Sequence, residues 1–164
     1  MNDEDTQLLQ VSVRGIVRDP RGNPVVLLKH DDGEEVLPIW IGHSEGVSIE
    51  LHLKDESFER PLTHDLLKTT LEFLGASVAR VAITELRDNT FYAKIYLQRE
   101  NDVFVIDARP SDSIALALKT SAPIFVSHEV FMNHRRVIQP ENLQREEGEG
   151  DLKRYLEGLD PGEF

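Results

Sequence analysis

The sequence predicts one α+β domain in which a strand-strand-strand-helix unit occurs twice in tandem. Three observations predict it: short apolar runs with the period of strands, helical patterns that follow them, and a match between the two halves at an offset of 67 residues, which places Val36 over Val103. We expect one mixed sheet, strongly curved or barrel-like, with the helices packed against it. A chain of 164 residues is long enough to bury a core of its own.

The first half combines three expected strands with a segment of ambiguous period. The strands are residues 11–17, 25–28 and 36–41, and the turn-forming sequence D-P-R-G-N-P separates the first two. From Val47 to Leu53 apolar residues alternate as in a strand, whereas Ser44 and Glu45 are typical of a helix start. The matching segment of the second half is helical, so the repeat predicts a helix over 44–53. A chance likeness of two strand-turn-helix segments would leave that segment undecided.

The clearest helical pattern spans residues 61–75. Thr63 is the expected N-cap, and Asp65 places a negative charge at the positive end of the helix dipole. Leucines recur along one face, and Gly75 suits the left-handed position that ends a helix.

The second half repeats the arrangement of strands and helix. Asp88 and Asn89 suit a tight turn between its first two strands. Ser111 is the expected cap of a helix over 113–119, whose apolar residues on all sides predict burial in the domain or between subunits. The remaining expected elements are strands at 78–86, 91–97, 103–108 and 124–126 and a short helix at 128–135.

These patterns predict one domain between two acidic tails. The expected bounds are 8–140 for the domain, about 11–60 and 78–120 for its repeats, and 1–7 and 141–164 for the tails. A short amphipathic helix is expected in the C-terminal tail, where apolar residues recur with helical spacing: Leu152, Tyr155, Leu156 and Leu159.

The charge distribution argues against a dedicated high-affinity DNA-binding protein. Of the net charge of −12, residues 1–7 carry −3 and residues 141–164 carry −5, which leaves −4 on the domain between them. A nearly balanced domain lacks the basic surface of such proteins. The sequence has no cysteine, no apolar run of about 18 residues and no apolar N-terminal leader. We therefore expect no disulfide and no membrane span, and a cytoplasmic location.

Candidate chemistry gathers where strands lead into helices, because familiar catalytic motifs are absent. The sequence has no phosphate-binding glycine loop, nucleophile elbow or H-E-x-x-H, its histidines lack zinc-ligand spacing, and we expect no organic cofactor. Asp107, Arg109 and Asp112 precede or begin the helix at 113–119. The two carboxylates can hold a divalent cation while Arg109 binds a phosphate. Alternatively, Ser111 and Asp112 only cap the helix, and Asp107 forms a structural ion pair with Arg109.

The counterpart of this cluster in the first repeat differs from it chemically. Glu45 lies where Asp112 lies in the second repeat, so it is a further candidate metal ligand. Gly42 stands where Arg109 stands, however. The second repeat is therefore the better candidate for an anion site.

Two other pairs of residues are candidates. His64 and Asp65 begin the helix at 61–75, where His64 is either a general base or metal ligand oriented by a carboxylate, or a solvated residue without a role. Phe91 and Tyr92 are expected on opposite faces of a strand. One of them is either exposed for stacking on a base or part of the core or an interface.

Five segments match a known family in order and spacing: L-P-I-W-I-G (37–42), R-P-L-T-H-D-L-L (60–67), D-N-T-F-Y-A (88–93), D-A-R-P-S-D-S-I-A-L-A-L (107–118) and A-P-I-F-V (122–126). They resemble the bifunctional nuclease (BFN) family over roughly residues 10–135. The resemblance implies a compact α+β domain that forms homo-oligomers. It also implies cleavage of DNA and RNA, the activity for which plant members are named. Residues 42–59 depart from the family, since they carry His52 and Lys54 where relatives are more apolar.

Two hypotheses follow. The first is a metal-dependent nuclease with little sequence preference, in which Mg²⁺ or Mn²⁺ is held by Asp107, Asp112 and Glu45, and in which the catalytic residues are His64, Asp65 and Arg109. The second is a non-catalytic homo-oligomeric binding or regulatory module, which the apolar helix at 113–119 and the lack of a basic surface favour. An open, acid-lined pocket would favour the enzyme, whereas a junction closed by internal salt bridges would favour the module.

Overall fold

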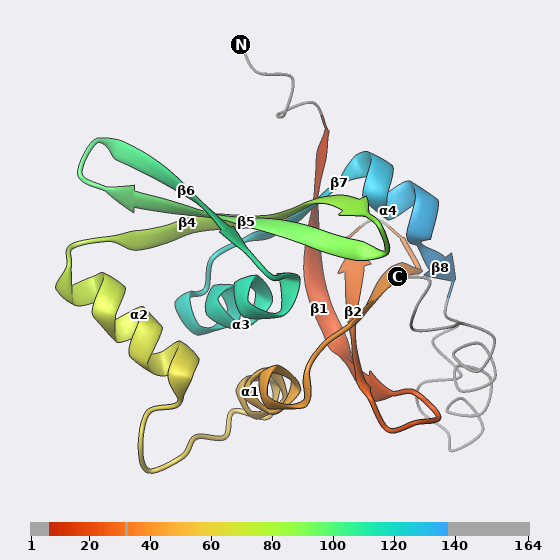
Figure 1. Cartoon of the computed structure of the whole chain (residues 1–164), viewed down its shortest axis with the longest axis horizontal. Helices are drawn as coiled ribbons and strands as arrows, with labels where there is room; N and C mark the ends of the chain where they lie inside the picture. The colour runs from red at the N-terminus through yellow and green to blue at the C-terminus, as the bar shows by residue number, and fades with distance from the viewer. Residues whose placement is uncertain (1–6, 32, 138–164) are drawn as a thin grey trace.

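Two antiparallel meanders of three strands each are joined by a single strand in the computed structural model, which describes residues 7–31 and 33–137. The strand order is β6-β5-β4-β7-β1-β2-β3-β8. The joining strand, β7 (Ile124–Ser127), pairs antiparallel with β1 (Leu8–Arg18) and parallel with β4 (Ser77–Arg87), so the sheet is mixed as expected. In Figure 1 the two meanders cross at a steep angle.

The other elements complete the sheet and its helices. The remaining strands are β2 (Pro24–His30), β3 (Glu35–Trp40), β5 (Thr90–Arg99), β6 (Asp102–Ala108) and β8 (Arg136–Val137). The helices are α1 (His43–Leu53), α2 (Thr63–Phe73), α3 (Pro110–Thr120) and α4 (His128–His134). Within the described residues none of these helices is both long enough and apolar enough to cross a membrane.

The sheet is open rather than closed into a barrel. Among the described strands β6 pairs only with β5, and β8 pairs only with β3, so each of them is an edge. The barrel-like alternative expected from the sequence is therefore wrong. The order strand-strand-strand-helix does occur twice, as β1–β2–β3–α1 and as β4–β5–β6–α3. A common origin by tandem duplication stays a prediction, because a shared order of elements does not demonstrate it.

The local signals were correct about most elements and wrong about two helix caps. The ambiguous segment is helix α1, as the repeat predicted. Helix α2 ends at Phe73, and Gly75 follows its C-cap in the expected left-handed conformation, with φ 71°. The N-cap of α2, however, is Leu62 rather than Thr63. Helix α3 begins at Pro110, whose fixed φ suits the first helical position, so Arg109 is the N-cap and Ser111 is a buried helical residue. The expected amphipathic helix of the C-terminal tail lies outside the described residues.

The core spans both meanders, and α1, which packs on β1 and β2, meets helix α3. This helix packs on β4 and β5 and contacts α1 and α2, and its residues from Ser113 to Ala117 are buried. The burial expected for an all-round apolar helix is thus confirmed. The turn between β4 and β5 is formed by Asp88 and Asn89, whose left-handed φ angles of 49° and 58° match the twist of a tight hairpin. These features place the starts of α1 and α3 and the β4–β5 turn around one region.

Candidate functional site

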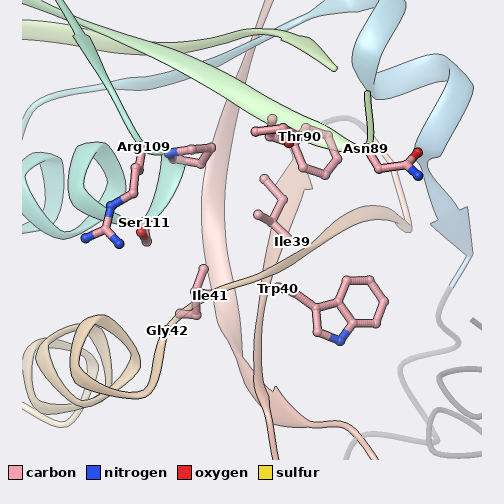
Figure 2. A pocket seen from close by; sticks show the side chains of 10 residues that line it. Ile39, Trp40, Ile41, Gly42, Asn89, Thr90, Arg109 and Ser111 are labelled. Atoms are coloured by element: carbon pink, nitrogen blue, oxygen red, sulfur yellow. The ribbon is translucent and has the colours of Figure 1, made fainter. Parts of the chain in front are cut away.

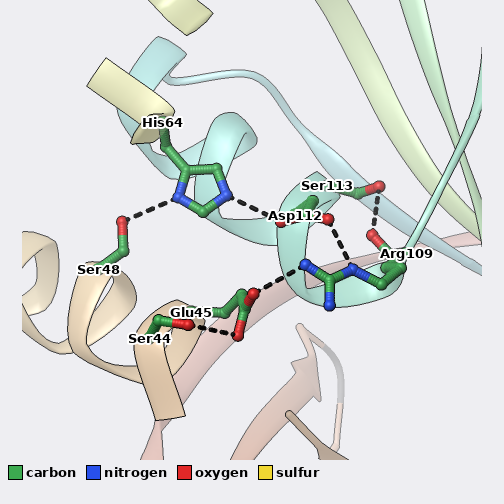
Figure 3. A network of polar contacts seen from close by, with 7 residues as sticks. All are labelled: Ser44, Glu45, Ser48, His64, Arg109, Asp112 and Ser113. Atoms are coloured by element: carbon green, nitrogen blue, oxygen red, sulfur yellow. Dashed lines mark hydrogen bonds and ion pairs between the residues drawn. The ribbon is translucent and has the colours of Figure 1, made fainter. Parts of the chain in front are cut away.

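Polar contacts connect seven residues into one group, which we call the junction cluster (Figure 3). Six of them belong to three helices and one, Arg109, precedes α3. The members are Ser44, Glu45, Ser48, His64, Arg109, Asp112 and Ser113. Glu45, His64 and Asp112 lie in the first turns of α1, α2 and α3, respectively. Since α3 contacts both other helices, these first turns come together. The structure thus assembles four of the residues that the sequence singled out: Glu45, His64, Arg109 and Asp112.

Arg109 links the acidic side chains of α1 and α3. Its Nε donates to Asp112 Oδ2 at 2.8 Å, and its Nη2 donates to Glu45 Oε1 at 2.7 Å. Hydrogen bonds to Asp112 and then to Glu45 raise the pKa of Arg109 above its ordinary value. Nevertheless 64% of the Arg109 side chain is exposed. A guanidinium that is fixed by two carboxylates and still reaches solvent can bind an anion.

Both carboxylates are ionised at neutral pH. A hydrogen bond from its own backbone N–H lowers the pKa of Glu45, and the Arg109 side chain lowers it further against the opposing effect of burial. Burial raises the pKa of Asp112, but hydrogen bonds from Arg109 and His64 outweigh this effect and the net shift is downward. The junction cluster is therefore an ion-pair network, with one cation between two anions.

His64 is enclosed between α1 and α3. Its ring Nδ1 lies 3.2 Å from Ser48 Oγ, and its Nε2 lies 3.0 Å from Asp112 Oδ1. A carboxylate can only accept, so we assign the ring hydrogen to Nε2 and the role of acceptor from the Ser48 hydroxyl to Nδ1. His64 and Ser48 are only 8% and 3% exposed. Direct contact of either side chain with a large substrate is therefore unfavourable in this conformation.

Asp65 points to a different part of α3. Its Oδ2 accepts the backbone N–H of Leu62 at 2.9 Å, and its Oδ1 lies 2.7 Å from Lys119 Nζ. The hydrogen bond from Lys119 is the main cause of a lowered Asp65 pKa. With one oxygen on the start of α2 and the other on the end of α3, Asp65 connects these two helices.

Asp107 lies apart from the junction cluster, and the metal ligands expected from the sequence do not assemble. In the strand register Asp107 of β6 lies opposite Lys94 of β5. Lys94 alternates with buried residues along β5, so the side chains of Lys94 and Asp107 point away from the core. In the part of the chain that the structure describes, no three His, Asp or Glu side chains could hold a metal ion together. Glu45 and Asp112 do approach one another, but Arg109 already supplies the cation between them. These residues do not fit the expected Mg²⁺ or Mn²⁺ site.

A cleft of about 370 Å³ opens beside the junction cluster (Figure 2). Three segments form its walls: the end of β3 and start of α1, the β4–β5 turn with the start of β5, and the start of α3. The lining residues are Ile39, Trp40, Ile41, Gly42, Asn89, Thr90, Phe91, Arg109, Pro110 and Ser111. Arg109 is the only charged residue among these lining residues, which all belong to the part of the chain that the structure describes. The cleft is thus partly apolar with one cation, and it differs from the acid-lined pocket expected of a metal enzyme.

Two functional contributions were missed by the sequence reasoning. Gly42 is one: a Cβ at this position would overlap Glu45 Oε2, so the absent side chain leaves room for the Glu45 carboxylate that pairs with Arg109. Ser48 is the other, and its only signal was a hydroxyl between two apolar residues in sequence, Val47 and Ile49. The alignment of the repeats had already set Gly42 opposite Arg109, but only the structure shows that the Glu45 carboxylate occupies the space where a side chain at this position would begin.

Comparison with known proteins gives a consistent family. The model of the bifunctional nuclease domain matches residues 26–139. An uncharacterized protein of Mycobacterium tuberculosis is 37% identical over 162 residues, which cover 94% of this chain and 97% of that protein. Bifunctional nuclease 1 of Oryza sativa subsp. indica is 29% identical over 129 residues, or 76% of this chain and 39% of the rice protein.

A second plant relative agrees with the first. Bifunctional nuclease 2 of Arabidopsis thaliana is 26% identical over 126 residues, which cover 74% of this chain and 38% of the Arabidopsis protein. The chain therefore spans about two fifths of the length of these plant proteins, while it matches nearly the whole of the mycobacterial protein.

Proposed function

Because the chain belongs to the bifunctional nuclease domain family, we propose that it hydrolyses phosphodiester bonds in DNA, RNA or both with little sequence preference. The names of the rice and Arabidopsis relatives support the reaction class. The cation beside the cleft supports it independently, because each phosphodiester carries one negative charge.

The position of Arg109 is the observation that carries the proposal. Its guanidinium is exposed at the wall of the cleft and at the start of α3, where the free N–H groups of a helix favour anions. The planar fork of an arginine suits two phosphate oxygens. Since Glu45 and Asp112 already hold the guanidinium, little reorganisation is needed when charge develops on a bound phosphate.

The proposed reaction is hydrolysis by water. The water oxygen forms a bond to phosphorus, the bond from phosphorus to a sugar oxygen breaks, and that oxygen takes up a proton from solvent. Asp112 accepts the proton of the attacking water, because a third of its side chain is exposed whereas His64 is almost buried. His64 then acts as a positioning residue that holds Asp112. The lowered pKa makes Asp112 a weak base, so we expect slow turnover.

Cleavage assays with matched variants test this proposal. Supercoiled plasmid and single-stranded RNA are incubated with the purified protein in Mg²⁺, Mn²⁺ or EDTA. Arg109→Gln is expected to slow cleavage by about 100-fold or more, the usual effect of removing a group that stabilises developing charge. Arg18→Gln is the matched control, because Arg18 also pairs with a carboxylate of α1, Glu50, at 2.8 Å but lies outside the cleft lining.

The outcomes separate the proposal from contamination. A wild-type protein that cleaves faster than Arg109→Gln and as fast as Arg18→Gln supports it. If Arg109→Gln cleaves as fast as wild type, the activity does not belong to this site and the proposal fails. Asp112→Asn provides the second variant, since it preserves the shape of the side chain while it removes the proton acceptor.

A non-catalytic binding module is the second candidate, and the closed junction favours it. Arg109 is paired with both nearby carboxylates, and no acid lines the cleft within the described residues. Such a module would bind a small anion such as pyrophosphate through Arg109 without cleaving nucleic acid. Titration calorimetry with pyrophosphate tests the module when the cleavage assay is negative: binding that Arg109→Gln abolishes supports it, whereas absence of binding by the wild type argues against it.

We also propose that the protein forms a homo-oligomer through strand β6. This edge strand exposes apolar side chains on both faces: Val103, Phe104, Val105 and Ile106 are 43–58% exposed. Open apolar edges promote pairing with another chain and are usually covered or charged in stable proteins. A second copy that pairs its own β6 antiparallel to the first would cover both strands with one symmetric contact.

A further inference from the structure

The face of the β4–β5–β6 meander that points away from the core carries aromatic and basic side chains. Alternate residues of β5, from Phe91 to Leu97, are buried in the core. The side chains between them therefore point to the opposite face, which we call the outer face. It displays Tyr92, Lys94 and Tyr96, all partly exposed. Figure 1 shows α2 and α3 on the same side of this meander, which is the side of the core.

Two arginines of β4 lie over the two tyrosines. The guanidinium carbon of Arg80 is 4.3 Å from the ring centre of Tyr96, and that of Arg87 is 4.5 Å from the ring centre of Tyr92. The tyrosines are four residues apart on one strand, so their rings are separated by roughly 14 Å along it. This spacing lets each ring contact a different base of one extended chain.

The charge of the outer face is opposite to that of the whole chain. Strand pairing places three basic residues on it, Arg80, Arg87 and Lys94, against the acids Glu85 and Asp107. The chain as a whole has a net charge of −12. A small excess of positive charge beside aromatic rings is complementary to the phosphates and bases of single-stranded nucleic acid.

The outer face is continuous with the cleft. Arg87 pairs with Thr90 across the β4–β5 hairpin, and Thr90 lines the cleft together with Arg109 (Figure 2). A bound strand can therefore pass from the tyrosines around the β4–β5 turn to Arg109. The exposed aromatic considered from the sequence is Tyr92, since Phe91 is buried in the core.

We propose that the outer face binds single-stranded DNA or RNA, with Tyr92 and Tyr96 stacking on bases and Arg80, Arg87 and Lys94 contacting phosphates. The choice of nucleic acid as the ligand rests on the proposed function. A single strand is specified because the base faces of a duplex are covered by their neighbours. The contacts are independent of base identity, so the binding shows little sequence preference.

Binding measured without cleavage tests this proposal separately from the nuclease activity. Fluorescence anisotropy of labelled oligo-dT and oligo-U is recorded in EDTA at low salt. Tyr92→Leu and Tyr96→Leu are each expected to weaken binding by about 5- to 150-fold, the range for loss of one stacked base. Tyr92→Phe and Tyr96→Phe keep the ring and are expected to bind as wild type does. Phe73→Leu serves as the control, because it removes an aromatic residue that is 89% exposed but lies on α2 rather than on the outer face.

Salt dependence identifies the phosphate contacts. For a single strand the slope of log K against log salt is about −0.7 for each phosphate contacted. Arg87→Gln is expected to make the slope less steep by about 0.7. Lys54→Gln removes an exposed cation at the C-cap of α1 and is expected to leave the slope unchanged.

The outcomes are decisive for the outer face. Ring-dependent binding supports the proposal even if the wild type cleaves nothing, in which case only the proposed function fails. Oligonucleotide binding that is absent, or that survives Tyr92→Leu and Tyr96→Leu unchanged, overturns the proposal. It is also overturned if the leucine variants reduce the mass measured by light scattering and the wild type does not bind oligonucleotides, because the outer face is then a contact between two copies of the chain.

Discussion

Glu45 Oε1 lies 2.7 Å from Arg109 Nη2, although 64 residues separate them in the sequence. The contact connects the first turn of α1 to the residue before α3, at the wall of the cleft. Gly42 leaves room for this contact, because a Cβ at that position would overlap the Glu45 carboxylate. Residues from the other half of the chain therefore help to position Arg109 at the wall of the cleft.

Gly42→Ala is expected to disturb Arg109 without unfolding the protein. The added methyl group displaces the flexible end of Glu45, so Arg109 loses one of its two partners. Because Arg109 is largely exposed, we expect a loss of less than about 1 kcal/mol in the free energy of unfolding, measured in urea. We expect a larger effect, about tenfold, on Arg109-dependent cleavage or pyrophosphate binding.

Gly15→Ala is the control for this variant, since a Cβ at Gly15 would meet no atom within 4 Å. Equal cleavage and binding by Gly42→Ala and wild type would show that Glu45 does not position Arg109.

The contact between Ser48 and His64 is expected to stabilise the helix layer. Ser48→Ala leaves the buried His64 Nδ1 without its hydroxyl partner, which costs about 1–3 kcal/mol. In a double-mutant cycle with His64→Leu we expect a coupling of about 1 kcal/mol in the free energy of urea unfolding. The exposed Ser12 provides the reference cycle: Ser12→Ala with His64→Leu should be additive within about 0.5 kcal/mol. Additive losses in both cycles would contradict a specific contact.

Asp19 makes stability depend on acid pH. It is buried in the β1–β2 turn, where Oδ1 accepts the backbone N–H groups of Arg21 and Asn23, and Oδ2 accepts the side chains of Asn23 and Trp40. Burial raises the Asp19 pKa, but these four hydrogen bonds outweigh it and lower the pKa below 3.8. A lowered folded-state pKa stabilises the protein at pH values above the unfolded pKa. This stabilisation is lost as the pH falls through the folded value.

Asp19→Asn is therefore expected to cost about 2 kcal/mol at pH 7 and less below about pH 4. In either orientation of the new amide, its NH₂ group faces two hydrogen-bond donors, which belong to the backbone or to the side chains of Asn23 and Trp40. An NH₂ group cannot accept these hydrogen bonds. Urea unfolding between pH 3 and pH 7 measures the difference from wild type, with Asp102→Asn on the exposed start of β6 as the control. A difference that is the same at every pH would show that the charge of Asp19 is not what stabilises the turn.

Sequence reasoning succeeded where a local pattern carries the physical cause. The left-handed turn at Asp88 and Asn89, the left-handed Gly75 after α2 and the burial of α3 each follow from a few neighbouring residues. The match of the repeats was also sufficient to predict that α1 is a helix, against its own alternating pattern.

The side-chain partners at the site could not be predicted in the same way. Asp107 and Arg109 are two residues apart, yet Asp107 belongs to a strand and points away from the core, whereas Arg109 turns toward α1. Which carboxylate meets the guanidinium depends on how α1 and α3 pack. The sequence therefore identified Glu45, His64, Arg109 and Asp112, which do meet, but it also placed Asp107 with them, and Asp107 lies apart from the junction cluster.

Val105→Lys is expected to block self-association through β6. Val105 lies near the middle of this edge strand, and in an antiparallel β6 pair centred on it the two lysines would face each other with equal charge. Light scattering with size exclusion is expected to show a wild-type oligomer and a smaller Val105→Lys species. Val137→Lys is the matched control, because Val137 is a 66% exposed valine on β8, at the opposite edge of the sheet. A monomeric wild type would contradict self-association. An oligomer that withstands Val105→Lys and dissociates with Val137→Lys would place the contact elsewhere. Since the Tyr96 ring lies on the neighbouring strand opposite Val105, the same variant also reveals whether oligomer formation and oligonucleotide binding depend on each other.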